Sequence, residues 1–289
     1  SRRRETEDSM NLTDLLTEGA YESRVWIDDV LLQDIGIAVL LNSDEPALPA
    51  LRNSSVTVPG RHGAYDFGAY LEPREFTLNC VFPRQSYTDL KRHIRELNQL
   101  FIDEYGRPKT VKLRFGDEVD KYYNVRLTGG IPVERVAERG FITINLTAFD
   151  PYAYSLVNAN EVTWGSEVVT FEWSYLLGMN GTGTGFTVTS PQTIPIYVDG
   201  NALRPVIEIN GSANNLTVSA NGKSFKLPNF SDTRWIIDGE NYVVIRNGAN
   251  DFASLDGEFI ELLNGDNDVV ISGNSLDFEI TIKYRDKYL

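Results

Sequence analysis

Polar and apolar residues alternate along much of this chain, and one stretch departs from that pattern toward a helical period. In Glu75–Phe82 every second residue is apolar, which predicts a strand with one buried face that includes Cys80. From Leu90 to Phe101 the apolar residues recur at helical spacing, and Gly106 and Pro108 end the run. This stretch therefore predicts an amphipathic helix, packed on the sheet of its own domain.

The rest of the first half also has the pattern of β structure. A turn at Asp28-Asp29 separates two short apolar runs, which predicts a hairpin. Further predicted strands are Ile35–Leu41, Ser54–Val58, Val111–Phe115 and Tyr122–Leu127. The first half is therefore expected to be an α+β domain in which one main helix lies on a sheet.

A glycine-rich segment, Arg61–Gly68, follows the strand that ends at Pro59-Gly60. Its glycines favour an irregular loop over a strand. The aromatic rings of Tyr65 and Phe67 are costly to leave in water, so we expect this loop to contact another surface.

The second half is divided by dipeptides that accept the positive φ of hairpin turns. They are Asp199-Gly200, Asn210-Gly211, Asn221-Gly222, Asp238-Gly239, Asn247-Gly248, Asp256-Gly257 and Asn264-Gly265. Predicted strands between them include Val206–Ile209, Trp235–Ile237, Tyr242–Ile245, Phe259–Leu262 and Phe278–Ile282. This spacing predicts an all-β sandwich or jelly roll.

The boundary between the halves falls at Phe149–Tyr154, because Asp150-Pro151 ends the preceding strand. We therefore expect an N-terminal domain at residues 11–151 and a C-terminal domain at residues 152–289, each with its own core. Residues 1–10 are interpreted as a disordered arm or an expression remnant. Arg2-Arg3-Arg4 within them would be a nucleic-acid hook on a sharper reading, but short charged termini are usually solvated.

Charge and composition narrow the classes of function. The net charge is −14, which argues against a surface that wraps nucleic acid. Cys80 is the only cysteine, so the fold does not depend on an intrachain disulfide, and no apolar run predicts membrane insertion.

The chain offers little catalytic or metal chemistry. Its two histidines, His62 and His93, lack an evident nucleophile, and with one cysteine they form no zinc pattern. A pair of carboxylates for glycoside hydrolysis stays an open alternative, because pairing depends on the fold. We expect no enzymatic activity and no cofactor. Gly181–Gly185 is interpreted as a surface loop, and Asp266-Asn267-Asp268 as an acidic turn and not a calcium loop.

Two groups of motifs resemble those of a known family, the distal tail (Dit) proteins of bacteriophages with long non-contractile tails. The first group is Val56–Gly68 followed by Phe149–Tyr152. The second group is Gly257–Leu262, Gly265–Asn267 and the final stretch Ile282–Leu289. The resemblance extends over the chain from about residue 12 onward, and the order of the motifs makes it specific.

The resemblance implies a virion protein of the tail tip, assembled in the host cytoplasm. The first domain would form a homo-hexameric ring, and the second, similar in fold to galectins or carbohydrate-binding modules, would project outward. The expected partners are the tail tube protein and the tail-associated hub or receptor-binding proteins. DNA would only pass through the channel. No enzymatic motif is carried over.

Six residues are candidate contact sites. Arg61, His62, Tyr65 and Phe67 are expected at the ring interface. Trp173 and Trp235 are the candidate contacts if the second domain is a glycan-binding module that adheres to the host cell wall, which is the alternative function. The same two alternatives apply to Trp164. Tryptophans in strands are more often buried in a core than exposed to stack on sugars.

Overall fold

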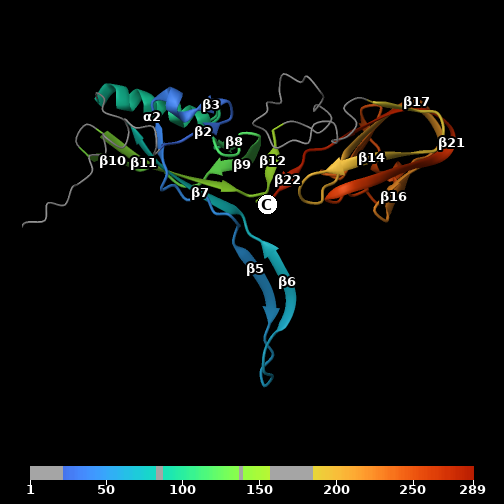
Figure 1. Ribbon diagram of the computed structural model, residues 1–289, viewed down its shortest axis with the longest axis horizontal. Helices are drawn as coiled ribbons and strands as arrows, with labels where there is room; N and C mark the ends of the chain where they lie inside the picture. The colour runs from blue at the N-terminus through green and yellow to red at the C-terminus, as the bar shows by residue number, and fades with distance from the viewer. Residues whose placement is uncertain (1–21, 83–86, 137–138, 157–184) are drawn as a thin grey trace, which may run out of the picture. The chain divides into compact units, whose positions relative to one another are not determined.

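In the computed structural model (Figure 1), residues 22–82, 87–136, 139–156 and 185–289 are described. The chain divides into two compact units, Ser1–Pro151 and Tyr152–Leu289. The predictions for residues 1–10, Gly181–Thr184, Trp164 and Trp173 lie outside the described residues. In the described part the protein is mostly β structure with one α-helix.

The first unit is built on a curled antiparallel sheet (Figure 1). The strand order is β1 (Glu22–Ser23), β4 (Ala38–Leu40), β7 (Arg74–Phe82), β11 (Arg139–Ala148), β9 (Lys121–Leu127), β8 (Thr110–Phe115), β2 (Val25–Ile27) and β3 (Val30–Leu31). A further strand, β10 (Val133–Val136), pairs with β11. Strands β1 and β2 lie near opposite ends of this strand order, but only Arg24 separates them along the chain. The two ends of the sheet are therefore brought together at Arg24. Gly116 N–H donates to Arg24 O at 2.8 Å beside this point.

The alternation predicted for the central strand is confirmed. Phe76, Leu78, Cys80 and Phe82 of β7 are all buried, and β11 pairs with β7 along their length. Burial raises the pKa of the Cys80 thiol to about 12, so this cysteine is a small core residue and not a reactive thiol. The predicted hairpin at Asp28-Asp29 is also present, as β2 and β3.

The helix α2 (Tyr87–Phe101) contains the predicted helical stretch Leu90–Phe101. Its residues Leu90, Leu97 and Phe101 are buried in the first unit, as the helical spacing predicted. A Cβ atom at Gly140 of β11 would lie 2.9 Å from Leu90 Cδ1, so a glycine at that position allows the helix to pack closely on the sheet.

One predicted strand of the first unit is shorter than expected. The segment Ile35–Leu41 begins as the end of a 3-10 helix, η1 (Leu32–Ile35), and only Ala38–Leu40 forms a strand. Gly36 adopts a φ of 75°, and its N–H closes the helical turn. A residue in this left-handed conformation cannot continue an extended strand, so the strand starts after it.

The second unit is all β in its described residues. One run of paired strands is β13 (Phe186–Val188), β21 (Gly265–Lys283), β15 (Val206–Ala220), β17 (Phe230–Asp238), β18 (Val243–Arg246) and β19 (Ala249–Asn250). In addition, β14 (Gln192–Val198) pairs with β21, and β16 (Lys223–Lys226) pairs with β15 and β20 (Asp256–Gly257). A short pair joins β12 (Ala153–Ser155) to β22 (Lys287–Tyr288), and η3 is Phe252–Ser254.

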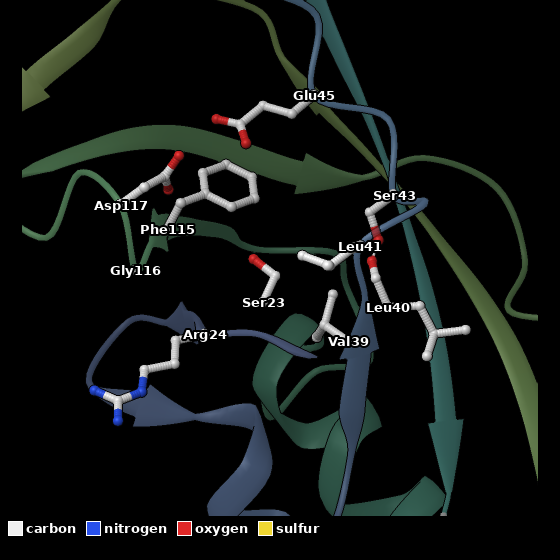
Figure 2. Close-up of a pocket in the computed structure, with 10 residues that line it drawn as sticks. All are labelled: Ser23, Arg24, Val39, Leu40, Leu41, Ser43, Glu45, Phe115, Gly116 and Asp117. Carbon is white, nitrogen blue, oxygen red and sulfur yellow. Dashed lines mark hydrogen bonds between the residues drawn. The ribbon is translucent and has the colours of Figure 1, made fainter. Parts of the chain in front are cut away.

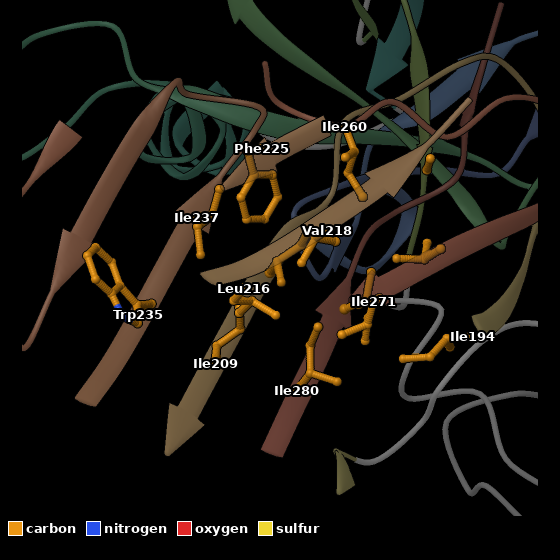
Figure 3. Close-up of a cluster of buried hydrophobic side chains, with 14 of the residues drawn as sticks. Ile194, Ile209, Leu216, Val218, Phe225, Trp235, Ile237, Ile260, Ile271 and Ile280 are labelled. Atoms are coloured by element: carbon orange, nitrogen blue, oxygen red, sulfur yellow. The ribbon is translucent and has the colours of Figure 1, made fainter. Parts of the chain in front are cut away.

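The two long strands β15 and β21 each contribute to two layers. The first half of β15 pairs with β17, its second half pairs with β16, and the register shifts between Gly211 and Ala213. The partner β21 meets both halves of β15 with similar shifts. A bulge bends a strand, so the paired strands fold over and enclose one core. Figure 3 shows Ile209 and Val218, from opposite halves of β15, in the same buried cluster.

Three details of the second unit differ from the sequence predictions. Asp256-Gly257, predicted to be a turn, forms the short strand β20, which pairs with β16. Asn210-Gly211 lies inside β15 and is not a hairpin turn, since Gly211, with a φ of 144°, sits at the bulge. The predicted strand Phe259–Leu262 is not a strand. Its only ladder contact is an isolated bridge between Leu262 and Leu203. The neighbours Phe259 and Ile260 are both buried, which a strand with one exposed face does not allow.

A buried carboxyl holds the end of the chain in the second unit. Asp286 has no exposed surface, and one of its oxygens accepts the N–H of Asp199 at 3.0 Å. Its backbone carbonyl accepts the N–H of Ser155. Burial away from water raises the pKa of this carboxyl to about 7, against the lowering effect of the Asp199 N–H and together with the charge of Asp199. The final strand β22 is thus fixed next to a group that resists ionisation.

We predict that Gly211→Ala strongly destabilises the second unit. The added Cβ would collide with the Asp277 carbonyl, and a φ of 144° is nearly restricted to glycine. We expect a loss of about 3 kcal/mol or more in the free energy of unfolding, measured by chemical denaturation. Gly222→Ala is the matched control, because its Cβ meets nothing within 4 Å, and it should cost about 1 kcal/mol. Equal costs for the two variants would contradict this account of the bulge.

We predict that Asp286→Asn reduces the loss of stability between pH 4 and pH 8. A carboxyl whose pKa is raised on folding contributes its full stability below the unfolded value of 3.8, and that stability is lost as the pH rises through about 7. At the upper limit the loss is on the order of 4 kcal/mol, since each unit is worth about 1.4 kcal/mol. The asparagine keeps an oxygen for the Asp199 N–H but cannot ionise.

The measurement for Asp286→Asn is chemical denaturation of the full chain at several pH values. The exposed Asp277→Asn in β21 is the control, and its pH profile should parallel that of the unchanged protein. If Asp286→Asn also gives a parallel profile, the carboxyl is not a source of the pH dependence.

Candidate assembly interface

A projecting hairpin, which we call the arm (Leu51–Leu71), is the most exposed ordered element of the first unit. It consists of β5 (Leu51–Val56) and β6 (Tyr65–Leu71), which pair with each other and, among the described strands, with no other. Figure 1 shows it extending away from the sheet that carries it. The arm continues into the central strand β7, so its base is anchored in the core.

The arm exposes apolar side chains on both faces. Phe67 and Tyr70 are 62% and 59% exposed, and Val56 is 53% exposed. An isolated two-stranded hairpin is only marginally stable in water, and a monomeric protein rarely leaves such a cluster uncovered. The composition of the arm therefore fits a segment that is buried by another protein surface.

The prediction that Arg61–Gly68 is an irregular loop is partly wrong. From Tyr65 onward it is strand β6. Gly68, with a φ of 96°, lies where the register shifts opposite Asn53 and Ser55. Its N–H is bound by the Asp66 carboxylate at 2.9 Å. The glycine thus permits an irregularity within the strand and does not end it.

The four predicted ring-interface residues all lie on the arm. At its tip Arg61 N–H donates to Val58 O at 3.1 Å, and the Arg61 guanidinium lies 4.1 Å from the centre of the Tyr65 ring. His62 is exposed beside them, and Phe67 follows on β6. The tip therefore presents a cation stacked on an aromatic ring.

The base of the arm is fixed by buried polar contacts. Arg74, the first residue of β7, is 2% exposed and donates through Nη1 to the Tyr123 hydroxyl at 2.7 Å. At the edge of the arm, Arg52 and Glu72 form an ion pair at 3.3 Å, and Glu72 N–H donates to Ala50 O. Removing a partner from Arg74 would leave a buried charge unsatisfied, so this contact strongly constrains where the arm begins.

A pocket of about 580 Å³ lies at the seam of the curled sheet, and its lining includes Ser23, Val39, Leu41, Phe115 and the carboxylates of Glu45 and Asp117. Figure 2 shows the two carboxylates on the same side of the pocket, near the Phe115 ring, while Arg24 points away. Burial, with the charges of Asp117 and Glu118, raises the pKa of Glu45 to about 7, although Arg74 opposes the shift. Apolar walls and acidic groups thus meet in one hollow.

The other residues considered for chemistry are placed elsewhere. His93 is stacked on Phe82, with ring centres 6.3 Å apart, which makes it a packing residue of the helix. The prediction of an acidic turn at Asp266-Asn267-Asp268 is wrong, because these residues lie in strand β21 and pair with β14. Asn267 is buried, and its side chain binds the backbone of Leu263 and Gly265. Among the described residues no group of three or more histidine, cysteine or acidic side chains could hold a metal ion. No described helix is long and apolar enough to cross a membrane.

Trp235, a candidate glycan contact, lies in the core. It has no exposed surface and packs edge-on against Phe230, with ring centres 6.0 Å apart. The Arg246 guanidinium lies 5.1 Å from the ring centre of Trp235. A sugar cannot stack on a ring without an exposed face. Trp235 is therefore a core residue, as its position in a strand favours.

Sequence reasoning missed Arg74, Glu45 and Asp117. A lone arginine before a strand and acidic residues in loops give no periodic signal. They are identified only because the fold places Arg74 beside Tyr123 and brings Glu45 and Asp117 to one pocket.

A comparison with known protein families gives a match in the first unit. Residues 30–148 match the model of the phage tail protein RIFT-related domain, which includes the arm and most of the curled sheet. No curated protein matches the chain in sequence.

Solved structures show the same fold. The Dit protein (gp 19.1) of phage SPP1, described as a paradigm of the hub adsorption apparatus in phages that infect Gram-positive bacteria, is 18% identical with a TM-score of 0.66. The match covers 92% of this chain and 99% of that one. Chains of the phage p2 baseplate, in its activated conformation with strontium or calcium, are 10% identical with TM-scores of 0.43 and 0.42. They cover 94% and 93% of this chain and 100% of their own, but scores this low add nothing on the fold.

We predict that Phe67→Ser leaves the stability of the isolated subunit nearly unchanged. The ring is 62% exposed, so its removal should change the free energy of unfolding by less than about 0.5 kcal/mol. Phe76→Ala, in the core next to Tyr123, should cost about 3–5 kcal/mol. Chemical denaturation under conditions where the protein is monomeric measures both. A large loss for Phe67→Ser would mean that the arm packs on its own subunit.

Proposed function

We propose that this chain, which resembles the distal tail (Dit) family of phage tail proteins, is a structural component of a phage tail tip or baseplate that assembles into a hexameric ring. The ring would join the tail tube to the tail-associated hub or receptor-binding proteins and leave a channel for DNA. The family resemblance predicted from the motifs is confirmed by the match over residues 30–148. The observation that carries the proposal of a ring is the exposed arm.

The arm supports assembly because it is a surface that requires a partner. In a ring each copy uses one surface to contact a different surface on the next copy. A hairpin that leaves its own subunit and carries Phe67 and Tyr70 into solvent is suited to one side of such an interface. The sheet of the first unit provides the opposite surface.

The charge of the chain supports passage of DNA and not its binding. The net charge is −14, and phosphate binding requires clustered lysine and arginine. A ring with an acidic wall would repel the phosphate backbone and let DNA slide. The role proposed here is therefore structural, without catalysis, and the protein would reside in the virion tail.

The second unit would project from the ring, and its partner would be another tail protein. The alternative of glycan adhesion loses support because Trp235 is buried. The likeness of this unit to galectins or carbohydrate-binding modules stays a prediction from the resemblance.

We predict that purified protein forms a hexamer that depends on the arm. Multi-angle light scattering should report six copies, alone or when tail tube or hub protein is added. The double variant Phe67→Ser, Tyr70→Ser should shift the population to monomer, since burial of each ring contributes about 1.5–3 kcal/mol per interface. Phe252→Ser is the matched control, because that ring is 51% exposed but lies on the second unit.

The control should keep the hexamer. A protein that is monomeric at every concentration, with and without those tail proteins, would contradict the proposal of a ring.

A further inference from the structure

We propose that the pocket lined by Glu45, Asp117 and Phe115 is the receiving site for the arm tip of the next copy in the ring. This inference rests on the proposed function, because it assumes that copies of the chain assemble in a ring. It goes further by naming the two surfaces that meet. The occupant is a segment of this same chain, Val58–Tyr65, supplied by a neighbour.

The chemistry of the two surfaces is complementary. The tip carries the cationic Arg61 stacked at 4.1 Å on the Tyr65 ring, with His62 beside them. The pocket offers two carboxylates on one side of an aromatic ring, and Arg24 is turned away from it (Figure 2). An arginine can bind a carboxylate through two parallel hydrogen bonds while its stacked ring packs on apolar atoms.

The pocket also has an apolar side that lacks a cover. Leu41 lines it and is 59% exposed, whereas Phe115 and Val39 beneath are buried. On the tip, Val58 and Tyr65 are 43% and 46% exposed. Joining these surfaces removes exposed apolar groups from water on both copies, which the isolated subunit cannot do for itself.

The length of the arm carries its tip away from its own pocket. Strand β5 (Leu51–Val56) alone spans about 20 Å at roughly 3.3 Å per residue, and the tip lies beyond it. A compact unit of this size is about 35 Å across. The pocket residue Glu45 lies a few residues before the base of the arm. An arm that starts near one pocket therefore carries its tip more than half the width of a subunit away from that pocket.

The electrostatic environment supports the same pairing. Burial and the charges of Asp117 and Glu118 raise the pKa of Glu45, so the carboxylates at the pocket repel one another. An incoming guanidinium would supply the opposite charge at this position. No ion pair is observed between Arg61 and a carboxylate within the described subunit, so this cation is available.

The test is a cysteine cross-link between copies. The natural Cys80 is buried and should not react in the folded protein. The double variant Leu41→Cys, His62→Cys places one thiol at the pocket and one at the tip, both at exposed positions. Treatment of the assembled protein with a short bis-maleimide should give a ladder of covalent oligomers up to the hexamer on a denaturing gel.

The matched control keeps the tip thiol and moves its partner. Tyr105→Cys, His62→Cys uses a residue that is 75% exposed in the same unit but does not line the pocket. We expect at least a tenfold lower yield of cross-linked oligomers for this pair. Each single-cysteine variant should give no ladder.

The outcomes separate the two proposals. If hexamers form by light scattering but the pocket pair cross-links no better than the control pair, the arm docks elsewhere and this inference is wrong, while the ring stands. If neither hexamers nor cross-links form with the tail proteins present, both proposals are wrong. A ladder specific to the pocket pair supports this assignment.

Discussion

The buried hydrogen bond between Arg74 and Tyr123 fixes the point at which the arm leaves the first unit. Arg74 is 2% exposed, and its guanidinium donates to the Tyr123 hydroxyl at 2.7 Å. A charge in this position is stable only if its partners stay in place, so β7 and β9 must keep their spacing. The strand that carries the arm is thereby held in the sheet. The hairpin has no core of its own, but its base is rigid.

Because its base is rigid, the arm presents its exposed surface in a fixed direction. A flexible segment with the same side chains would lose most of its binding free energy in becoming ordered. Here the anchored base, the ladder between β5 and β6 and the stacking of Arg61 on Tyr65 reduce this cost of ordering. The pocket at the seam near Arg24 is equally part of the sheet, since the strands that line it are fixed by the core.

The second unit encloses its core in a different way. The long strands β15 and β21 bend at bulges and take part in both layers, so no separate second sheet is needed. The buried carboxyl of Asp286 then ties the end of the chain to Asp199 and Ser155. This unit has a continuous apolar core that includes Trp235, which leaves its tryptophan unavailable for ligands.

The sequence by itself determined the elements whose burial has a regular period. The alternation in β7 and the helical spacing of Leu90, Leu97 and Phe101 identified their buried faces, because each pattern follows directly from local geometry. The motif Val56–Gly68 lies within the residues that match the phage tail protein RIFT-related domain. Only the tertiary structure decided that Tyr65 begins a strand of a projecting arm and that Gly211 bends a strand where a turn was expected.

Those features depend on contacts between distant segments. Gly211 is required by the backbone of Asp277, and Phe259–Leu262 departs from a strand because neighbouring side chains are both drawn into the core. Likewise, Glu45 and Asp117 belong to one pocket only because the sheet curls at Arg24. Local patterns carry no information about which distant groups will meet, and that is why the pocket was found in the structure and not in the sequence.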